Sequence, residues 1–122
     1  MPRHTLDESR LHPAIADRVT HWQVDIVRNV QSAVASNPVL VVGMAQNPFC
    51  GRARKALAAA DVPHHYLEFG SYFSHWQQRG ALKMWSGWPT FPMVFVKGVL
   101  VGGAADLKTL IDSGELKRTL AA

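Results

Sequence analysis

The sequence of residues 88–103 is WPTFPMVFVKGVLVGG, and it predicts a β-hairpin. Two runs of β-branched and aromatic residues, 93–96 and 99–101, are separated by Lys97-Gly98 alone, which is the spacing of a two-residue turn between paired strands. Pro92 comes directly before the first run, where it cannot donate a ladder hydrogen bond. A cis bond before Pro92 would turn the preceding backbone toward a ligand, whereas a trans bond would make it an ordinary loop proline. A lone proline at this position favours the ordinary loop.

The segments before and after the hairpin alternate between helix and strand. The predicted elements, in chain order, are a long amphipathic helix over 13–36, a buried strand over 39–44, a helix over 52–60, a strand over 64–69, a helix from about 76 to 87 with Ser71 or Ser74 as its N-cap, the hairpin, and a helix over 105–113 with a short helical tail. A βαβ unit followed by a hairpin and a closing helix predicts an α/β fold. The expected architecture is a four-stranded mixed β-sheet flanked by helices, the thioredoxin-like fold, with an extra N-terminal helix.

Composition and length predict one ordinary globular domain. The chain has 122 residues, 48% of them hydrophobic and 18% charged, so we expect a single domain over residues 13–122 after a flexible tail over residues 1–12. The net charge of +4 comes from dispersed basic residues, which argues against nucleic-acid binding. No apolar run is long enough to span a bilayer, and the N-terminal residues carry no secretory signal. A single cysteine suits a reducing compartment, so a cytoplasmic location is expected.

Cys50 is the only cysteine of the chain and lies in NPFCGRARK, residues 47–55. In the first turn of a helix a cysteine faces unpaired backbone N–H groups and the positive end of the helix dipole, which favour the thiolate. The alternative is a buried, inert cysteine. Because one thiol cannot form an internal disulfide, sulfur chemistry here requires a second sulfur from a small thiol, a partner protein or another copy of the chain.

Several motifs, in the same order, resemble the glutaredoxin family and specifically its monothiol branch. That branch has a Trp-Pro-Thr-x-Pro segment, which Trp88–Pro92 matches, and a Pro-x-Cys-Gly segment, which Pro48–Gly51 matches. Lys97-Gly98 and Gly102-Gly103 follow in the same order, and the resemblance covers residues 37–110. Separate motifs in register make the resemblance far more specific than the lone cysteine.

The resemblance implies a glutathione site beside Cys50. In this family the tripeptide pairs with the backbone before a cis proline, its γ-glutamyl end lies at the Gly-Gly helix start, and its glycine carboxylate contacts basic side chains. The residues implied are Cys50, Thr90, Phe91 and Pro92 along the groove, Gly103, Ala104 and Asp106 at the γ-glutamyl end, and Arg79 at the glycine carboxylate. A helix N-terminus and an arginine both suit carboxylates. For Arg79 the alternative is a solvated helix surface.

Three positions depart from the family pattern. Met44 stands where the family has a lysine at the end of the first strand, which removes a charge-assisted contact of about 1.5–3 kcal/mol and predicts weaker glutathione binding. Ala53 stands where the family has a serine or a second cysteine, so a dithiol mechanism is excluded. Ala105 replaces an aspartate after Gly-Gly, and the neighbouring Asp106 is the candidate to bind the γ-glutamyl amine instead.

Three functions remain open. In the first, two protomers each supply Cys50 and one glutathione as the four thiolate ligands of a [2Fe-2S] cluster, which the cluster-bridged homodimer passes to a recipient protein. In the second, the Cys50 thiolate attacks a glutathionylated protein and free glutathione resolves the mixed disulfide, so the protein is a glutathione-dependent oxidoreductase. In the third, a degenerate module keeps the fold for binding. The Trp-Pro-Thr-x-Pro segment favours the first function.

Overall fold

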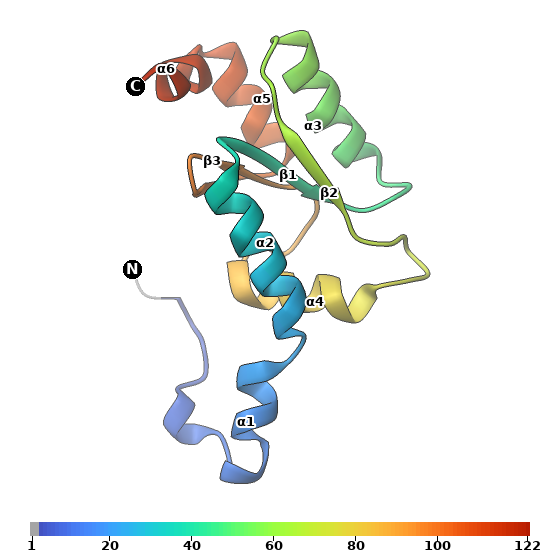
Figure 1. Ribbon diagram of the computed structural model, residues 1–122, viewed down its shortest axis with the longest axis vertical. Coiled ribbons are helices and arrows are strands. Elements are labelled where there is room, and N and C mark those ends of the chain that lie inside the picture. Colours follow the sequence, from blue (N-terminus) through green and yellow to red (C-terminus); the bar gives the residue numbers. More distant parts are fainter. Residues whose placement is uncertain (1–2) are drawn as a thin grey trace.

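A four-stranded mixed sheet forms the centre of the molecule, in a computed structural model that describes residues 3–122 (Figure 1). The strands are β1 (Val39–Gly43), β2 (His65–Glu68), β3 (Met93–Val96) and β4 (Val99–Gly102), in the spatial order β2-β1-β3-β4. β1 is parallel to β2 and antiparallel to β3, and β3 is antiparallel to β4. The predicted thioredoxin-like sheet and its hairpin are therefore confirmed.

Helices cover both faces of this sheet (Figure 1). Those that pack on it are α2 (Val24–Ser36), α3 (Pro48–Ala59), α4 (Trp76–Ser86), α5 (Ala104–Asp112) and α6 (Glu115–Ala121). A short 3-10 turn over Glu8–Arg10 and the helix α1 (Pro13–His21) precede them in the chain. Alternate residues of β1 feed two separate cores, because successive strand side chains point to opposite faces. Leu40 and Val42 pack with α2 and α4, whereas Val39 and Val41 pack with α3, α5 and α6.

The predicted single helix over residues 13–36 is wrong, because the structure breaks it into α1 and α2. Gln23 has φ 48°, in the left-handed region, and separates the two helices. α2 buries Val30 against the sheet, but α1 has no buried residue. The apolar residues of α1 recur with the same spacing as those of α2. However, α1 lies beyond the end of the sheet, so its apolar face has no core to pack against.

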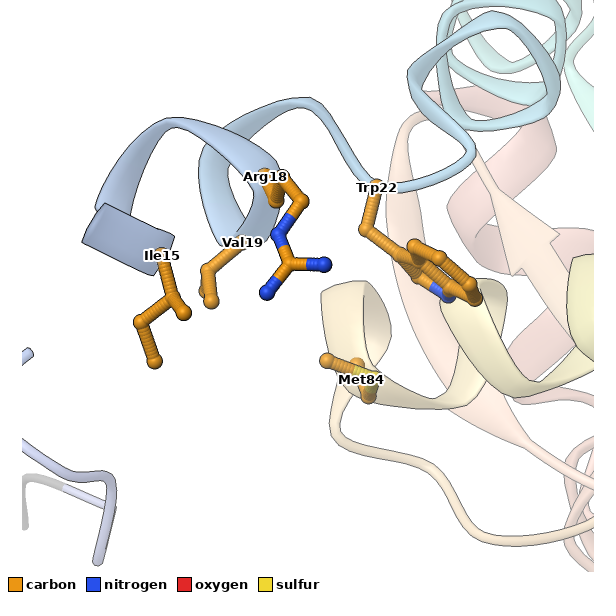
Figure 2. Close-up of a pocket in the computed structure, with 5 residues that line it drawn as sticks. All are labelled: Ile15, Arg18, Val19, Trp22 and Met84. Atoms are coloured by element: carbon orange, nitrogen blue, oxygen red, sulfur yellow. The ribbon is translucent and has the colours of Figure 1, made fainter.

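An apolar groove separates α1 from α4 (Figure 2). Its volume is about 330 Å³, and its lining residues are Ile15, Arg18, Val19, Trp22 and Met84. At the same, C-terminal end of α4, the guanidinium of Arg3 donates a hydrogen bond to the backbone oxygen of Ser86 over 2.9 Å. The flexibility expected for residues 1–12 stays a prediction. Among residues 3–122 no helix is long and apolar enough to cross a membrane.

Two helix starts differ from the prediction. α4 is capped by neither Ser71 nor Ser74, since its N-cap is His75 and the Ser74 hydroxyl instead accepts a hydrogen bond from the Ser71 N–H. α3 begins at Pro48 rather than at residue 52. Proline suits the first position of a helix because the N–H it lacks has no helical acceptor there. The earlier start places Cys50 within the first turn of α3.

Candidate functional site

Asn47 holds Cys50 at the start of α3. The Asn47 Oδ1 atom accepts hydrogen bonds from the N–H of Phe49 over 2.9 Å and from the N–H of Cys50 over 3.3 Å. Asparagine is among the best N-caps because its side chain satisfies these otherwise unpaired donors. The Asn47 Nδ2 atom donates to the backbone oxygen of Phe91 over 3.4 Å. One side chain thus joins the cysteine turn to the segment before Pro92.

The sulfur of Cys50 lies against the ends of β1 and β2. Cys50 is only 2% exposed. A Cβ atom added to Gly43 would come within 2.8 Å of the Cys50 Sγ and 2.9 Å of the Tyr66 Oη, so the missing side chain makes room for both. The Tyr66 hydroxyl donates to the carboxylate of Glu68 over 3.0 Å. Sulfur, phenol and carboxylate therefore form one cluster.

The surroundings of Cys50 favour the thiol over the thiolate. Burial is the largest influence and raises the pKa of Cys50; the backbone N–H of Met44 lowers it, and the negative charge of Glu68 raises it again. The same cluster raises the pKa of Tyr66, chiefly by burial and then through its hydrogen bond to Glu68. Burial thus outweighs the favourable helix position that the sequence indicated.

The basic residues after Cys50 contact aromatic rings. The Arg52 guanidinium lies 5.0 Å from the centre of the Phe49 ring, and that of Arg54 lies 4.1 Å from the centre of the Tyr66 ring. Neither arginine contributes to the pKa shift of Cys50, whose charged neighbour is Glu68. Arg54 instead acts on Tyr66, whose pKa its positive charge lowers in part against the larger raising effects of burial and Glu68.

Alkylation of Cys50 should show the raised thiol pKa directly, because the chain has no other cysteine. Only the thiolate reacts with iodoacetamide, so we expect the rate to rise with pH through a midpoint above that of free glutathione measured in parallel. Glu68→Gln removes the nearby negative charge and should lower the midpoint. Glu115→Gln, on α6, is the control and should not move it. A wild-type midpoint below that of glutathione would contradict this account of the site.

The segment before Pro92 lies beside the cysteine turn. The Phe91–Pro92 peptide bond is cis, so the sequence preference for an ordinary loop proline was wrong. Phe91 is 6% exposed and packs in the same core as Cys50, while Thr90 is exposed. The backbone oxygen of Phe91 accepts a hydrogen bond from Asn47. The backbone N–H of Phe91 has no acceptor among residues 3–122. The Phe91 N–H is thus a backbone donor that a ligand could use.

The start of α5 forms the other end of this region. The Asp106 carboxylate accepts a hydrogen bond from the N–H of Gly103 over 3.0 Å, so it caps its own helix. Ala104 opens the helix, and the first N–H groups of a helix have no intrahelical acceptor. Trp88 lies next to Gly103, and its Nε1 atom is buried without a hydrogen-bond partner in the described part of the chain.

Arg79 is buried rather than solvated. It is 7% exposed, and its Nη1 atom donates to the backbone oxygen of Phe69 over 2.9 Å and to that of Ser74. These bonds hold both ends of the loop between β2 and α4. The contact of Arg79 with a glycine carboxylate stays a prediction, because at least one of its nitrogens is already used inside the protein.

Lys83 is a basic residue of this region to which sequence reasoning assigned no contact. It is exposed, one turn after Arg79 on α4, and its Nζ atom lies 5.8 Å from the centre of the Phe91 ring. The spacing of four residues from Arg79 was the available signal, since such residues share a helix face. Lys83 thus offers a cation next to the segment before Pro92.

The structure brings most of the predicted site residues to one end of the sheet. Cys50 and Phe91 share a core, Pro92 is close to Gly103, and Asp106 caps the helix that Ala104 opens. No group of three or more His, Cys, Asp or Glu side chains suitable for a metal ion occurs within residues 3–122. The described part of the chain therefore supplies a single thiol and no such group of metal ligands.

Comparison with known proteins identifies proteins that this chain resembles in sequence and in fold. Residues 39–101 match the family model described as glutaredoxin. A glutaredoxin-like protein of Dictyostelium discoideum is 41% identical over 102 residues, which are 84% of this chain and 83% of the relative. Monothiol glutaredoxin-S11 of Oryza sativa subsp. japonica is 34% identical over 94 residues, which are 74% of this chain and 19% of that protein. A buckwheat glutaredoxin-glutathione complex matches with a TM-score of 0.71 at 23% identity, over 83% of this chain and 92% of that one.

Proposed function

Because the chain belongs to the glutaredoxin family, we propose that it is a monothiol glutaredoxin that uses Cys50 together with glutathione to carry a [2Fe-2S] cluster. The observation that carries this proposal is the position of its one thiol, in the first turn of α3 and in the same core as Phe91, which precedes the cis Pro92. The single cysteine and its monothiol relatives support a mechanism without an internal disulfide.

Glutathione would lie between the cysteine turn and the start of α5. Phe91 would pair with it through its free N–H, with Thr90 and Pro92 beside it. Gly103 and Ala104 would face its γ-glutamyl carboxylate, because a helix N-terminus favours an anion. Its glycine carboxylate would be near Lys83 and Arg79. Asp106 has a second carboxylate oxygen for the γ-glutamyl amine, since the Gly103 bond uses one oxygen only.

The cluster is cargo that two copies of the chain would share. Such a cluster needs four thiolates, and each copy supplies one from Cys50 and one from its glutathione. Iron binds the thiolate, so loading would release the Cys50 proton. A raised thiol pKa is compatible with this use, whereas it slows attack on a disulfide at neutral pH. A reducing compartment such as the cytoplasm would keep both thiols available.

Two other functions stand as alternatives. As an oxidoreductase, Cys50 would attack the sulfur of glutathione in a mixed disulfide and release the protein thiol. A second glutathione would then form oxidised glutathione and regenerate Cys50. As a degenerate binding module, the chain would neither carry a cluster nor reduce a disulfide. The buried Arg79 and the methionine at position 44 favour this third function. Glutathionylated proteins or cluster recipients are the partners that the first two functions require.

Anaerobic reconstitution distinguishes these functions. Wild-type protein is incubated with ferrous iron and sulfide, with and without glutathione, and its visible absorption and size are measured. Thiolate-ligated cluster bands that need glutathione, in a species of twice the monomer mass, would support the carrier. Without bands, glutathione-dependent reduction of a mixed disulfide would indicate the oxidoreductase. Failure of both would leave the binding module.

A further inference from the structure

The tryptophan three residues before Phe91 has a buried polar atom that nothing in the described chain satisfies. The Trp88 Nε1 atom is closed off from solvent and has no hydrogen-bond acceptor among residues 3–122. A buried donor without an acceptor is destabilising, because it has lost its water and gained nothing in return. The Trp88 backbone N–H, by contrast, donates to the Ser86 hydroxyl over 3.1 Å. The indole N–H is therefore the unsatisfied group.

This indole N–H lies at the start of α5. A Cβ atom built on Gly103 would be 3.8 Å from the Trp88 Nε1 atom and 3.6 Å from the backbone oxygen of Pro92. Because residue 103 has no side chain, this space is open. The N–H of Gly103 already donates to Asp106, and the N–H groups of Ala104 and Ala105 have no acceptor in the described chain. One buried side-chain donor and two backbone donors thus lie close together at the start of α5.

We propose that the Trp88 indole N–H donates a hydrogen bond to the γ-glutamyl carboxylate of bound glutathione, together with the first N–H groups of α5. The proposal rests on the function proposed above. A carboxylate suits the site because it only accepts hydrogen bonds, and the position offers donors and the positive end of a helix dipole. In this bound state the indole would have to turn so that its nitrogen, buried in the unliganded chain, faces the space above Gly103. Trp88 then determines specificity for the γ-glutamyl end of the ligand.

The proposal has a direct spectroscopic readout. The chain has four tryptophans, so ¹⁵N-labelled protein gives four indole N–H signals, of which Trp88→Phe removes one and so identifies it. We expect S-methylglutathione, which cannot react with Cys50, to shift the Trp88 signal downfield and more than those of Trp22 and Trp76. The shift itself is measured on the wild-type protein, and the variant serves only to assign the Trp88 signal.

Affinity measurements on matched variants complete the test. Trp88→Phe keeps an aromatic ring and removes the N–H, and we expect it to weaken S-methylglutathione binding about tenfold. Trp85→Phe, the same change three residues earlier, should leave affinity unchanged. Cysteinylglycine lacks the γ-glutamyl carboxylate and should bind the wild type and Trp88→Phe equally weakly.

The outcomes separate this inference from the proposed function. If S-methylglutathione binds while the Trp88 signal stays in place and Trp88→Phe binds as the wild type does, the role of Trp88 is overturned and the glutathione site stands. If the wild type binds neither S-methylglutathione nor glutathione at millimolar concentration, both proposals fail.

Discussion

Replacing Cys50 with serine is expected to abolish cluster assembly and glutathione-dependent disulfide reduction together. Cys50 is the only sulfur nucleophile of the chain, and a hydroxyl at neutral pH neither ligates a thiolate-type cluster nor attacks a disulfide. We therefore expect the Cys50→Ser protein to show no thiolate-to-iron absorption after reconstitution and only the background rate of mixed-disulfide reduction. The comparison with wild type under the same anaerobic conditions measures both losses.

A matched variant separates the loss of sulfur from a loss of fold. Cys50 is 2% exposed, so a serine there buries a hydroxyl at a cost of about 1–3 kcal/mol. Ala53→Ser also buries a hydroxyl on α3, at a residue with 0% exposure in the other core. It should lower the free energy of unfolding by a similar amount and keep the cluster. Cluster bands that persist in Cys50→Ser would refute the role of this sulfur.

Replacing Arg79 with methionine is expected to lower the free energy of unfolding by about 3 kcal/mol. Arg79 is 7% exposed and donates to the backbone oxygens of Phe69 and Ser74. Hydrogen bonds from charged groups contribute about 1.5–3 kcal/mol each, and their loss leaves partly buried carbonyls without a donor. For a domain of this size the melting temperature should fall by roughly 10 °C. Urea unfolding and thermal melts followed by circular dichroism measure both quantities.

Lys83 supplies the matched control for Arg79. Both are basic residues of α4, four positions apart, but Lys83 is exposed and near the Phe91 ring. Lys83→Met should leave stability within about 0.5 kcal/mol of wild type and weaken glutathione binding, which calorimetry detects. If Arg79→Met instead unfolds with the same free energy as wild type and loses only its affinity for glutathione, Arg79 is a carboxylate ligand. Its assignment as a structural residue would then be wrong.

Local sequence signals identified most elements of the fold. The hairpin around Lys97-Gly98, the buried strand at 39–43 and the helix after Gly103 all depend on neighbours a few residues apart. The prediction of a single helix over residues 13–36 was wrong because it relied on such local spacing alone. The apolar spacing continues from α1 through Trp22 into α2 without interruption. Only the tertiary structure shows that α1 lies beyond the sheet and that the helix is broken at Gln23.

The properties of the candidate site depended on contacts between distant segments. The helix position of Cys50 indicated a thiolate, but burial beside Gly43 and, to a smaller extent, the charge of Glu68 raise its pKa. Sequence also gave no indication that the Asn47 amide would reach the backbone of Phe91, 44 residues away. Apolar periodicity and turn residues do not predict how far a side chain is removed from water, because burial depends on which elements pack around that residue.

The sequence by itself determined the order of the elements from the first strand onward, the family resemblance, and that the chain has one thiol, since these follow from residue types and short spacings. Only the tertiary structure decided how deeply Cys50 is buried, that Arg79 binds the protein's own backbone, and that the Trp88 N–H has no partner beside Gly103. The physical reason is that burial and hydrogen-bond partners arise between segments far apart in the chain, and folding alone brings those segments together.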